Sequence, residues 1–137
     1  GARFVKFEIE PVIDHHANSD FPLYRYADVL LMKAEALMRI NGGSATAEAL
    51  DLVNEVHTRA GLKEYTLSEL TLDELLDERG RELAWEGHRR QDLIRFGKFH
   101  LGGWEFIDPQ SPNRCIYPIP QWVLDANPGV YTQNNWK

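Results

Sequence analysis

The hydrophobic positions of this chain recur mainly at helical spacing. Between about Tyr24 and Asn41 the apolar residues follow the i, i+3, i+4, i+7 pattern of one buried stripe, which predicts an amphipathic helix. Gly42 and Gly43 follow, and glycine is common just beyond a helix end. The stripe consists of Ala27, Leu30, Leu31, Ala34, Leu37 and Met38, whereas Asp28, Glu35 and Arg39 fall outside it.

A second helix is predicted from about Ala45 to Ala60, with Ser44 or Thr46 as its N-cap and Gly61 as its stop. The two helices and their short loop resemble a tetratricopeptide-type hairpin. Because one such hairpin cannot bury both of its faces, at least one more helical layer is expected. The apolar face of the second helix is predicted to hold Ala49, Val53, Val56 and Ala60.

A third helix is predicted to begin after Thr71, because Thr71 and Glu74 have the spacing of a capping box. Gly80 in its interior costs roughly 1 kcal/mol relative to alanine, which indicates that another backbone passes close to it. Gly87 is predicted to break or bend this helix, and a fourth segment to run from His88 to Phe96. The apolar face of the third helix holds Leu72, Leu75, Leu76 and Leu83.

The two ends of the chain carry a different pattern. Residues 4–9 form a short β-prone run closed by Pro11, which predicts an edge strand or an extended lead-in. Beyond Gly97 the chain is rich in Gly, Pro, Asn and aromatic residues, with one helical turn expected near residues 121–125. We therefore predict a mainly α fold of tetratricopeptide-like hairpins, with an irregular C-terminal wrap and a short N-terminal strand, forming a single helical region over residues 1–137.

Composition limits the classes of function. With 137 residues, 43% of them hydrophobic, the chain is long enough for one domain with a core. Its net charge of -6 is not arranged in blocks of one sign, so we expect neither nucleic acid nor a membrane surface as a direct partner. No apolar run approaches the roughly 18 residues of a membrane span. The one cysteine, Cys115, is interpreted as a small apolar filler.

The densest polar cluster surrounds the third helix and consists of Arg79, Arg81, Glu82, Glu86, Arg89, Asp92 and Arg95. If helicity persists, four of these residues share an arc of about 80° and alternate in charge. The catalytic alternative takes Glu82 and Glu86 as a hydrolase pair, in which one carboxyl must hold a proton near neutral pH. Neighbouring arginines favour the ionised form, so we interpret the cluster as a structural charge network without catalytic residues.

Other kinds of site are not indicated. A carboxylate-bridged metal site would place a histidine three residues after Glu86, where Arg89 stands. There is no G-x-S-x-G motif and no phosphate-binding glycine loop, so we expect no metal and no cofactor. The histidines are interpreted as surface or hydrogen-bonded residues: His15, His16, His57 and His100.

Aromatic residues could stack on sugar rings as well as fill a core. Trp85 is expected in the core because it lies within the predicted third helix. Trp104 and Trp136 have loop settings in which a sugar platform is conceivable, although packing is the preferred interpretation. Four tyrosines are expected to bury their rings while their hydroxyls reach a partner: Tyr24, Tyr26, Tyr117 and Tyr131.

Several runs, in the same order, resemble the C-terminal region of SusD/RagB family proteins. They are residues 25–37 (RYADVLLMKAEAL), 54–62 (NEVHTRAGL), 78–89 (ERGRELAWEGHR), 92–98 (DLIRFGK) and 117–120 (YPIP), followed by Asn127-Pro128 and Gln133-Asn134. The chain departs from the family pattern at His57, where arginine is more usual, and at Asn135-Trp136, where Pro-Gly is expected. The resemblance covers roughly Phe21 to Asn134, and ordered motifs are more specific together than singly.

The resemblance implies a surface-exposed outer-membrane lipoprotein that binds oligosaccharides or peptides without cleaving them, above a TonB-dependent transporter. It also implies that the lipid anchor and most of the fold lie upstream, together with most of the glycan platform, so no ligand-binding residue is carried over. We therefore predict a non-catalytic glycan-binding component of an outer-membrane uptake complex. The alternative, from the hairpin alone, is an intracellular tetratricopeptide-like scaffold that binds peptides in a concave groove.

Overall fold

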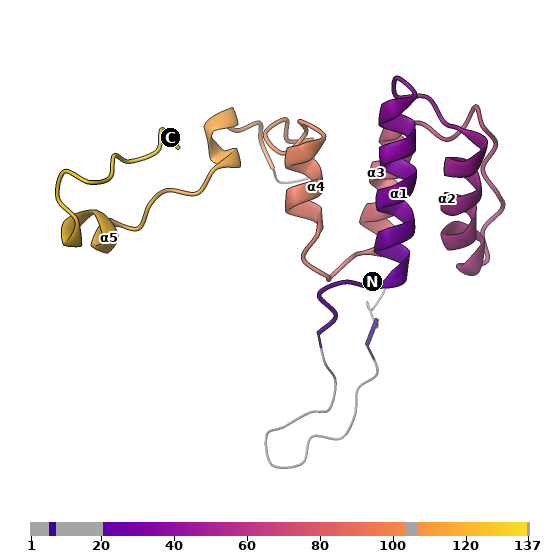
Figure 1. Ribbon diagram of the computed structural model, residues 1–137, viewed down its shortest axis with the longest axis horizontal. Helices are drawn as coiled ribbons and strands as arrows, with labels where there is room; N and C mark the ends of the chain where they lie inside the picture. The colour runs from indigo at the N-terminus through magenta and orange to yellow at the C-terminus, as the bar shows by residue number, and fades with distance from the viewer. Residues whose placement is uncertain (1–5, 8–20, 104–106, 137) are drawn as a thin grey trace, which may run out of the picture. The chain divides into compact units, whose positions relative to one another are not determined.

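The computed structural model describes residues 6–7, 21–103 and 107–136, which fall into two compact units, 1–89 and 90–137. The regular elements of both units are helices (Figure 1), in agreement with the predicted mainly α fold. The described elements are α1 (Tyr26–Ile40), α2 (Ala47–Arg59), α3 (Leu72–Glu82), α4 (Arg89–Arg95), the 3-10 helix η1 (Pro112–Cys115) and α5 (Gln121–Ala126).

The N-terminal strand predicted over residues 4–9 falls almost wholly outside the described residues. Of that run only Lys6 and Phe7 are described, and neither lies in a strand. No element of the described part of the chain is a strand, so the described fold is built from helices and irregular segments alone.

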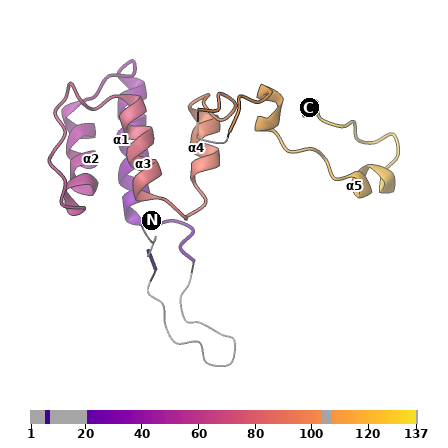
Figure 2. The ribbon, with the colours of Figure 1, turned by 180° about the vertical axis from the view of Figure 1, so that it is seen from behind.

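The first unit is a three-helix arrangement in which α1 packs against both α2 and α3 (Figures 1 and 2). This confirms the predicted hairpin and the additional helix that must cover its open face. The buried apolar stripes of the three helices meet in one cluster, because each side chain there gains more by leaving water than it loses in rotamer freedom. The cluster contains Leu30, Leu31, Ala34, Met38, Ala49, Val53, Val56, Leu70 and Leu75.

The polar face of α1 differs from the prediction. Asp28 and Glu35, expected outside the buried stripe, are both buried, and only Arg39 is exposed as expected. Burial of a carboxylate is tolerated when a cation accompanies it, and Glu35 accepts a hydrogen bond of 2.7 Å from Nε of Arg39. The spacing of hydrophobic residues contains no information about such ion pairs. The prediction that Asp28 and Glu35 lie outside the buried face was therefore wrong.

Helix α2 begins at the predicted place. The hydroxyl of Thr46 accepts a hydrogen bond of 3.1 Å from the backbone N–H of Ala49, which selects Thr46 over Ser44 as the N-cap. At the other end Ala60 is the C-cap and is exposed. The prediction that Ala60 belongs to the buried face of this helix was therefore wrong. His57 is buried on that helix instead.

Helix α3 begins after Thr71, as predicted, and the Thr71 hydroxyl accepts a hydrogen bond of 3.1 Å from the N–H of Glu74. It ends at Glu82, before the predicted break at Gly87. Trp85 and Gly87 have positive φ angles of 67° and 80°, and such backbone cannot continue a right-handed helix. The segment after Glu82 is therefore a turn.

Gly80 is close to another group, as predicted, but that group is a side chain. A Cβ at Gly80 would lie 2.7 Å from Nη1 of Arg89 and 3.0 Å from its Cζ. The same Nη1 donates a hydrogen bond of 2.7 Å to the carbonyl of Leu76 on α3. The absence of a side chain at Gly80 thus admits the Arg89 guanidinium, to which the three nearest atoms all belong.

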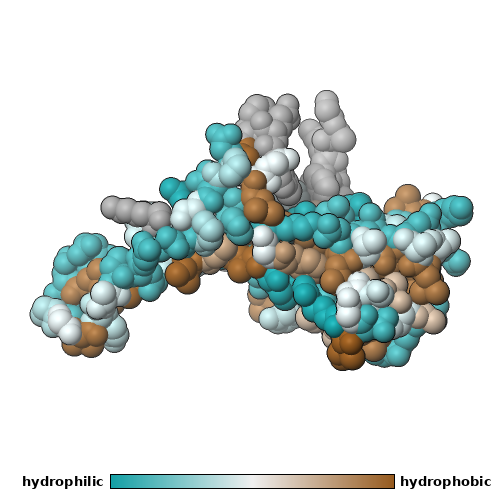
Figure 3. Space-filling model, turned by 90° about the horizontal axis from the view of Figure 1, so that it is seen from above, coloured by the Kyte–Doolittle hydropathy of each residue, from teal (hydrophilic) through white to brown (hydrophobic). Residues whose placement is uncertain are grey.

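The second unit contains α4, η1 and α5 between irregular segments, which agrees with the predicted tail composition and its single helical turn. That the tail wraps the helices remains a prediction. None of the described helices is long and apolar enough to cross a membrane. Hydrophobic side chains, drawn in brown, interrupt the polar surface seen in Figure 3. Tyr26, Val29 and Ile40 are among the large hydrophobic residues that are exposed.

Candidate functional site

The charged residues predicted around α3 all lie in ion pairs or hydrogen bonds, although they do not form one ladder. Because α3 ends at Glu82, the condition of continued helicity fails for Glu86 and Arg89. Arg79 pairs instead with Asp28 of α1, at 2.9 Å. In the second unit, Nη2 of Arg95 lies 2.9 Å from Oδ1 of the buried Asp92.

Two cations gather at the C-terminal end of α3. Arg25, the residue before α1, donates hydrogen bonds to the carboxylate and the backbone carbonyl of Glu82, and its Nε donates to Glu86 at 2.7 Å. Lys6 also forms an ion pair with Glu86, and donates to the carbonyls of Glu82 at 2.5 Å and of Ala84 at 3.0 Å. These carbonyls carry the negative end of the helix dipole, so both cations are favoured here.

These contacts do not favour the protonated carboxyl that the hydrolase alternative requires of Glu86. Burial would raise the pKa of Glu86, but hydrogen bonds from Arg25 and Lys6 outweigh it and hold the pKa below its ordinary value. Glu82 is bound by Arg25 and also by Arg59, whose Nη2 lies 2.5 Å away. A general acid must keep its proton near neutral pH, and the contacts of Glu86 favour its loss.

A second cluster of polar side chains links α2 to α3. Nδ1 of the buried His57 lies 2.9 Å from Oε2 of Glu78, and the ring of His57 stacks on Tyr65 with centroids 4.1 Å apart. The hydroxyl of Tyr65 donates to Glu74 at 2.6 Å, and burial together with this bond raises the pKa of Tyr65. Arg81 neutralises both carboxylates. His57 is therefore hydrogen-bonded, as predicted from the sequence.

Metal ligands do not converge in the described part of the chain, where no group of three histidine, cysteine or acidic residues could hold an ion. His15 and His16 lie outside the described residues. Trp104 lies outside them as well, and Trp136 is partly buried.

The prediction that Trp85 is in the core was wrong. Trp85 is 74% exposed; α3 ends before it, and its backbone has a positive φ angle that leaves the helix. The tyrosine prediction was wrong too, since Tyr24, Tyr26, Tyr117 and Tyr131 expose half or more of their surfaces. Exposed aromatic rings are available to a ligand in a way that core rings are not.

One of these tyrosines borders a cavity of about 390 Å³ within the second unit, a volume in the range of about 300 to 1,000 Å³ that is typical of ligand sites. Sequence reasoning did not identify this cavity, because its walls come from four separate segments. They are α4 with Arg90 and Leu93, residues 98–110 with Lys98, Phe99, Gly102, Ile107 and Gln110, η1 with Arg114, and the extended segment with Tyr117.

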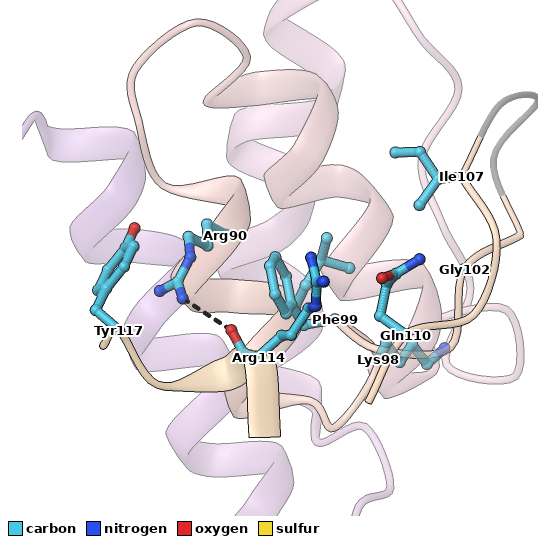
Figure 4. A pocket seen from close by; sticks show the side chains of 9 residues that line it. Arg90, Lys98, Phe99, Gly102, Ile107, Gln110, Arg114 and Tyr117 are labelled. Atoms are coloured by element: carbon cyan, nitrogen blue, oxygen red, sulfur yellow. Dashed lines mark hydrogen bonds between the residues drawn. The ribbon is translucent and has the colours of Figure 1, made fainter. Parts of the chain in front are cut away.

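Arg90 organises one side of this cavity (Figure 4). Its guanidinium lies between two rings, 4.0 Å from the centroid of Tyr117 and 4.9 Å from that of Phe99. Its Nη2 donates to the backbone carbonyls of Arg114, at 3.3 Å, and of Cys115, at 3.2 Å. The contacts fix Tyr117 and η1 around α4.

The backbone around the cavity is held by further contacts. At Gly102 a Cβ would lie 2.7 Å from the carbonyl oxygen of Ile107, and φ is +68°, so the loop requires glycine there. Gln133 exchanges two hydrogen bonds of 2.8 Å with the backbone of Ile119, and Nδ2 of Asn134 donates to the carbonyl of Tyr117 at 2.8 Å. The extended segment that carries Tyr117 is thereby fixed.

The helical hairpin with its third helix defines a tetratricopeptide-like protein. The chain belongs to the SusD family, whose sequence model matches residues 13–112. This confirms the family that the ordered motifs indicated.

Curated relatives agree with this assignment. The chain is 42% identical over 130 residues to the starch-binding protein SusD of Bacteroides thetaiotaomicron, a match that covers 89% of this chain and 22% of that protein. It is 38% identical over 141 residues to the SusD-like protein P38 of Formosa agariphila, covering 93% of this chain and 26% of that protein.

Solved structures also resemble the chain. The surface glycan-binding protein A from Bacteroides uniformis matches with a TM-score of 0.72 and 35% identity over 85% of this chain and 28% of that one. A SusD superfamily protein from Parabacteroides distasonis matches with a TM-score of 0.71 and 29% identity, over 83% and 26%. The chain thus spans about a quarter of the length of the proteins it matches.

Proposed function

We propose that this chain is the helical C-terminal region of a larger glycan-binding protein that belongs to an outer-membrane nutrient uptake complex. The observation that carries the proposal is membership of the SusD family, together with relatives named as a starch-binding protein and a surface glycan-binding protein. These names do not favour the alternative of an intracellular peptide-binding scaffold.

The proposed protein binds glycan without cleaving it. The contacts of Glu86 support this, because two cations favour its ionised form and so remove the proton that a glycosidase acid must donate. We expect no release of reducing ends from starch, xylan or pectin by the wild-type chain. Hydrolysis that disappears in Glu82→Gln or Glu86→Gln would overturn this part of the proposal.

The principal glycan platform is proposed to lie upstream of this chain, in the part of the protein that the relatives' greater length implies. Affinity gel electrophoresis on plant, host and storage polysaccharides tests this division. We expect a longer polypeptide that contains this chain to be retarded in at least one gel, and the chain alone to run unretarded in gels of neutral polysaccharide. Free migration of the longer polypeptide in every gel would contradict a glycan-binding function.

The proposed location is the outer face of the outer membrane, with a lipid anchor in the upstream part and a TonB-dependent transporter as partner. Family membership supports this location. Labelling of intact cells with a membrane-impermeant reagent should modify the longer protein, and a TonB-dependent transporter should co-purify with it. Labelling only after cell lysis would contradict surface exposure.

A further inference from the structure

The arginines of the described chain divide into two groups by their partners. Most pair with a carboxylate: Arg25, Arg39, Arg59, Arg79, Arg81, Arg89 and Arg95. Among the described arginines only Arg90 and Arg114 pair with no carboxylate, and both line the cavity of the second unit. The two described arginines without a carboxylate partner therefore border the same cavity.

The two arginines differ in what they can offer a ligand. Arg90 donates to two backbone carbonyls and lies between the rings of Phe99 and Tyr117. It therefore adds positive charge to the cavity and stabilises the positions of the residues that line it. The side chain of Arg114 has no hydrogen-bond or ion-pair partner within the described part of the chain, and the residue is exposed. Its planar fork of donors matches a carboxylate, with which it can form two parallel hydrogen bonds.

The remaining walls suit a ring with an apolar face. Leu93, Phe99, Ile107 and Tyr117 provide aliphatic and aromatic surface, and Gln110 provides an amide beside it. None of the described lining residues carries a carboxylate. Apolar surface against a ring face, with cations at its edge, is the chemistry that recognises an acidic sugar rather than a neutral one.

We propose that this cavity is an accessory site for a uronic acid residue of an oligosaccharide, with the sugar ring against the Phe99 and Tyr117 wall and its carboxylate bound by Arg114. The inference rests on the proposed glycan-binding function and adds a ligand class and a second site within residues 90–137. Binding there depends on charge, so it weakens as salt rises.

Isothermal titration of the whole chain with trigalacturonate and with its fully methyl-esterified form tests the proposal. The ester keeps the rings and removes the negative charge. We expect the acid to bind at least tenfold more tightly than the ester, because only the acid can form charge-assisted hydrogen bonds with the Arg114 guanidinium. Equal affinity for acid and ester would overturn the assignment.

Variants locate the site. Arg114→Ala should weaken trigalacturonate binding roughly tenfold or more, since it removes the carboxylate's partner. Arg59→Ala is the matched control, because it removes the same charge from an exposed residue outside this cavity. Arg59 pairs with Glu82, and Glu82 retains its ion pair with Arg25 in this variant. We expect Arg59→Ala to bind trigalacturonate as tightly as the wild type does. Unchanged binding by Arg114→Ala, or an equal loss in Arg59→Ala, would contradict the site.

Tyr117→Ala tests the ring surface, with a circular dichroism melt to check that the variant folds. We expect a folded Tyr117→Ala chain to lose affinity for acid and ester alike, and an unchanged affinity would overturn the role of the ring. These results are separate from the polysaccharide gels. Retardation of the longer polypeptide with no acid preference in this chain would refute the accessory site and leave the glycan-binding function standing.

Discussion

Nη1 of Arg79 lies 2.9 Å from Oδ1 of Asp28, and the two side chains are only 2% and 1% exposed. The pair joins α3 to α1 inside the first unit. Removal of two charges from water is costly, so a buried pair persists only where the geometry brings the charges together. The contact therefore constrains how α3 lies against α1.

Loss of either partner from this pair should be strongly destabilising. Asp28→Asn or Arg79→Met leaves the other residue buried with reduced charge compensation, and we expect a loss of about 3 to 5 kcal/mol in the free energy of unfolding. Urea unfolding followed by circular dichroism measures it. The double variant Asp28→Leu/Arg79→Met should recover part of that loss.

The exposed pair of Lys33 and Glu48, at 2.7 Å, provides the matched control. Lys33→Ala should cost less than about 1 kcal/mol, because solvent screens a pair that is more than half exposed. Similar costs for the buried and the exposed pair would show that burial of Arg79 and Asp28 is not what makes their contact important.

The ion pairs of Glu86 near the end of α3 should make the free energy of unfolding decrease as the solution becomes acidic. Hydrogen bonds from Arg25 and Lys6 hold the pKa of Glu86 below its ordinary value, despite the opposing effect of burial. The resulting stabilisation is complete above the unfolded pKa of about 4.3 and is lost as pH falls through the lower folded pKa. Urea unfolding between pH 6 and pH 3, at about half-unit steps, should show a shallower loss of stability in Glu86→Gln than in the wild type. Parallel curves for the two proteins would contradict this role of Glu86.

Gly80 and Arg89 should be energetically coupled. Gly80→Ala gains about 1 kcal/mol of helix propensity but places a methyl group against the Arg89 guanidinium, which must then leave the Leu76 carbonyl. We expect no net gain from Gly80→Ala alone, and a gain of about 1 kcal/mol in an Arg89→Ala background. A double-mutant cycle from urea unfolding gives the coupling, and additive effects would refute it.

Arg89→Ala by itself tests how much this contact contributes. The Arg89 side chain is about one-third exposed and donates to the Leu76 carbonyl and to Asp77, so we expect a cost of about 1 to 2 kcal/mol rather than that of a fully buried ion pair. The thermal melt measures it, and an unchanged midpoint would show that the hydrogen bond to Leu76 contributes nothing.

The N-cap of α3 should contribute measurably. Thr71→Ala removes the acceptor for the Glu74 N–H and is expected to cost about 1 kcal/mol. Thr58→Ala is the control, because the exposed Thr58 hydroxyl donates to the carbonyl of Asn54 within α2 and caps no helix end. We expect it to change stability by less than about 0.5 kcal/mol. Equal effects of the two variants would argue against capping by Thr71.

Local signals made much of the helical fold predictable. The 3.6-residue spacing placed α1 and α2, and the Thr71 and Glu74 spacing placed the start of α3, because helix caps and amphipathic faces depend on neighbours within one or two turns. Ordered motifs also indicated the family. The sequence by itself thus determined the helices, their hairpin and the class of protein.

The tertiary structure decided which charges are buried and where the unpaired ones gather. Asp28 lies on the buried side of α1 because Arg79, about fifty residues later, meets it there. Arg90, Arg114 and Tyr117 border one cavity because separate segments fold together around it. Periodicity along one helix carries no information about partners from distant segments, and only the folded chain brings these groups within hydrogen-bonding and ring-stacking distance.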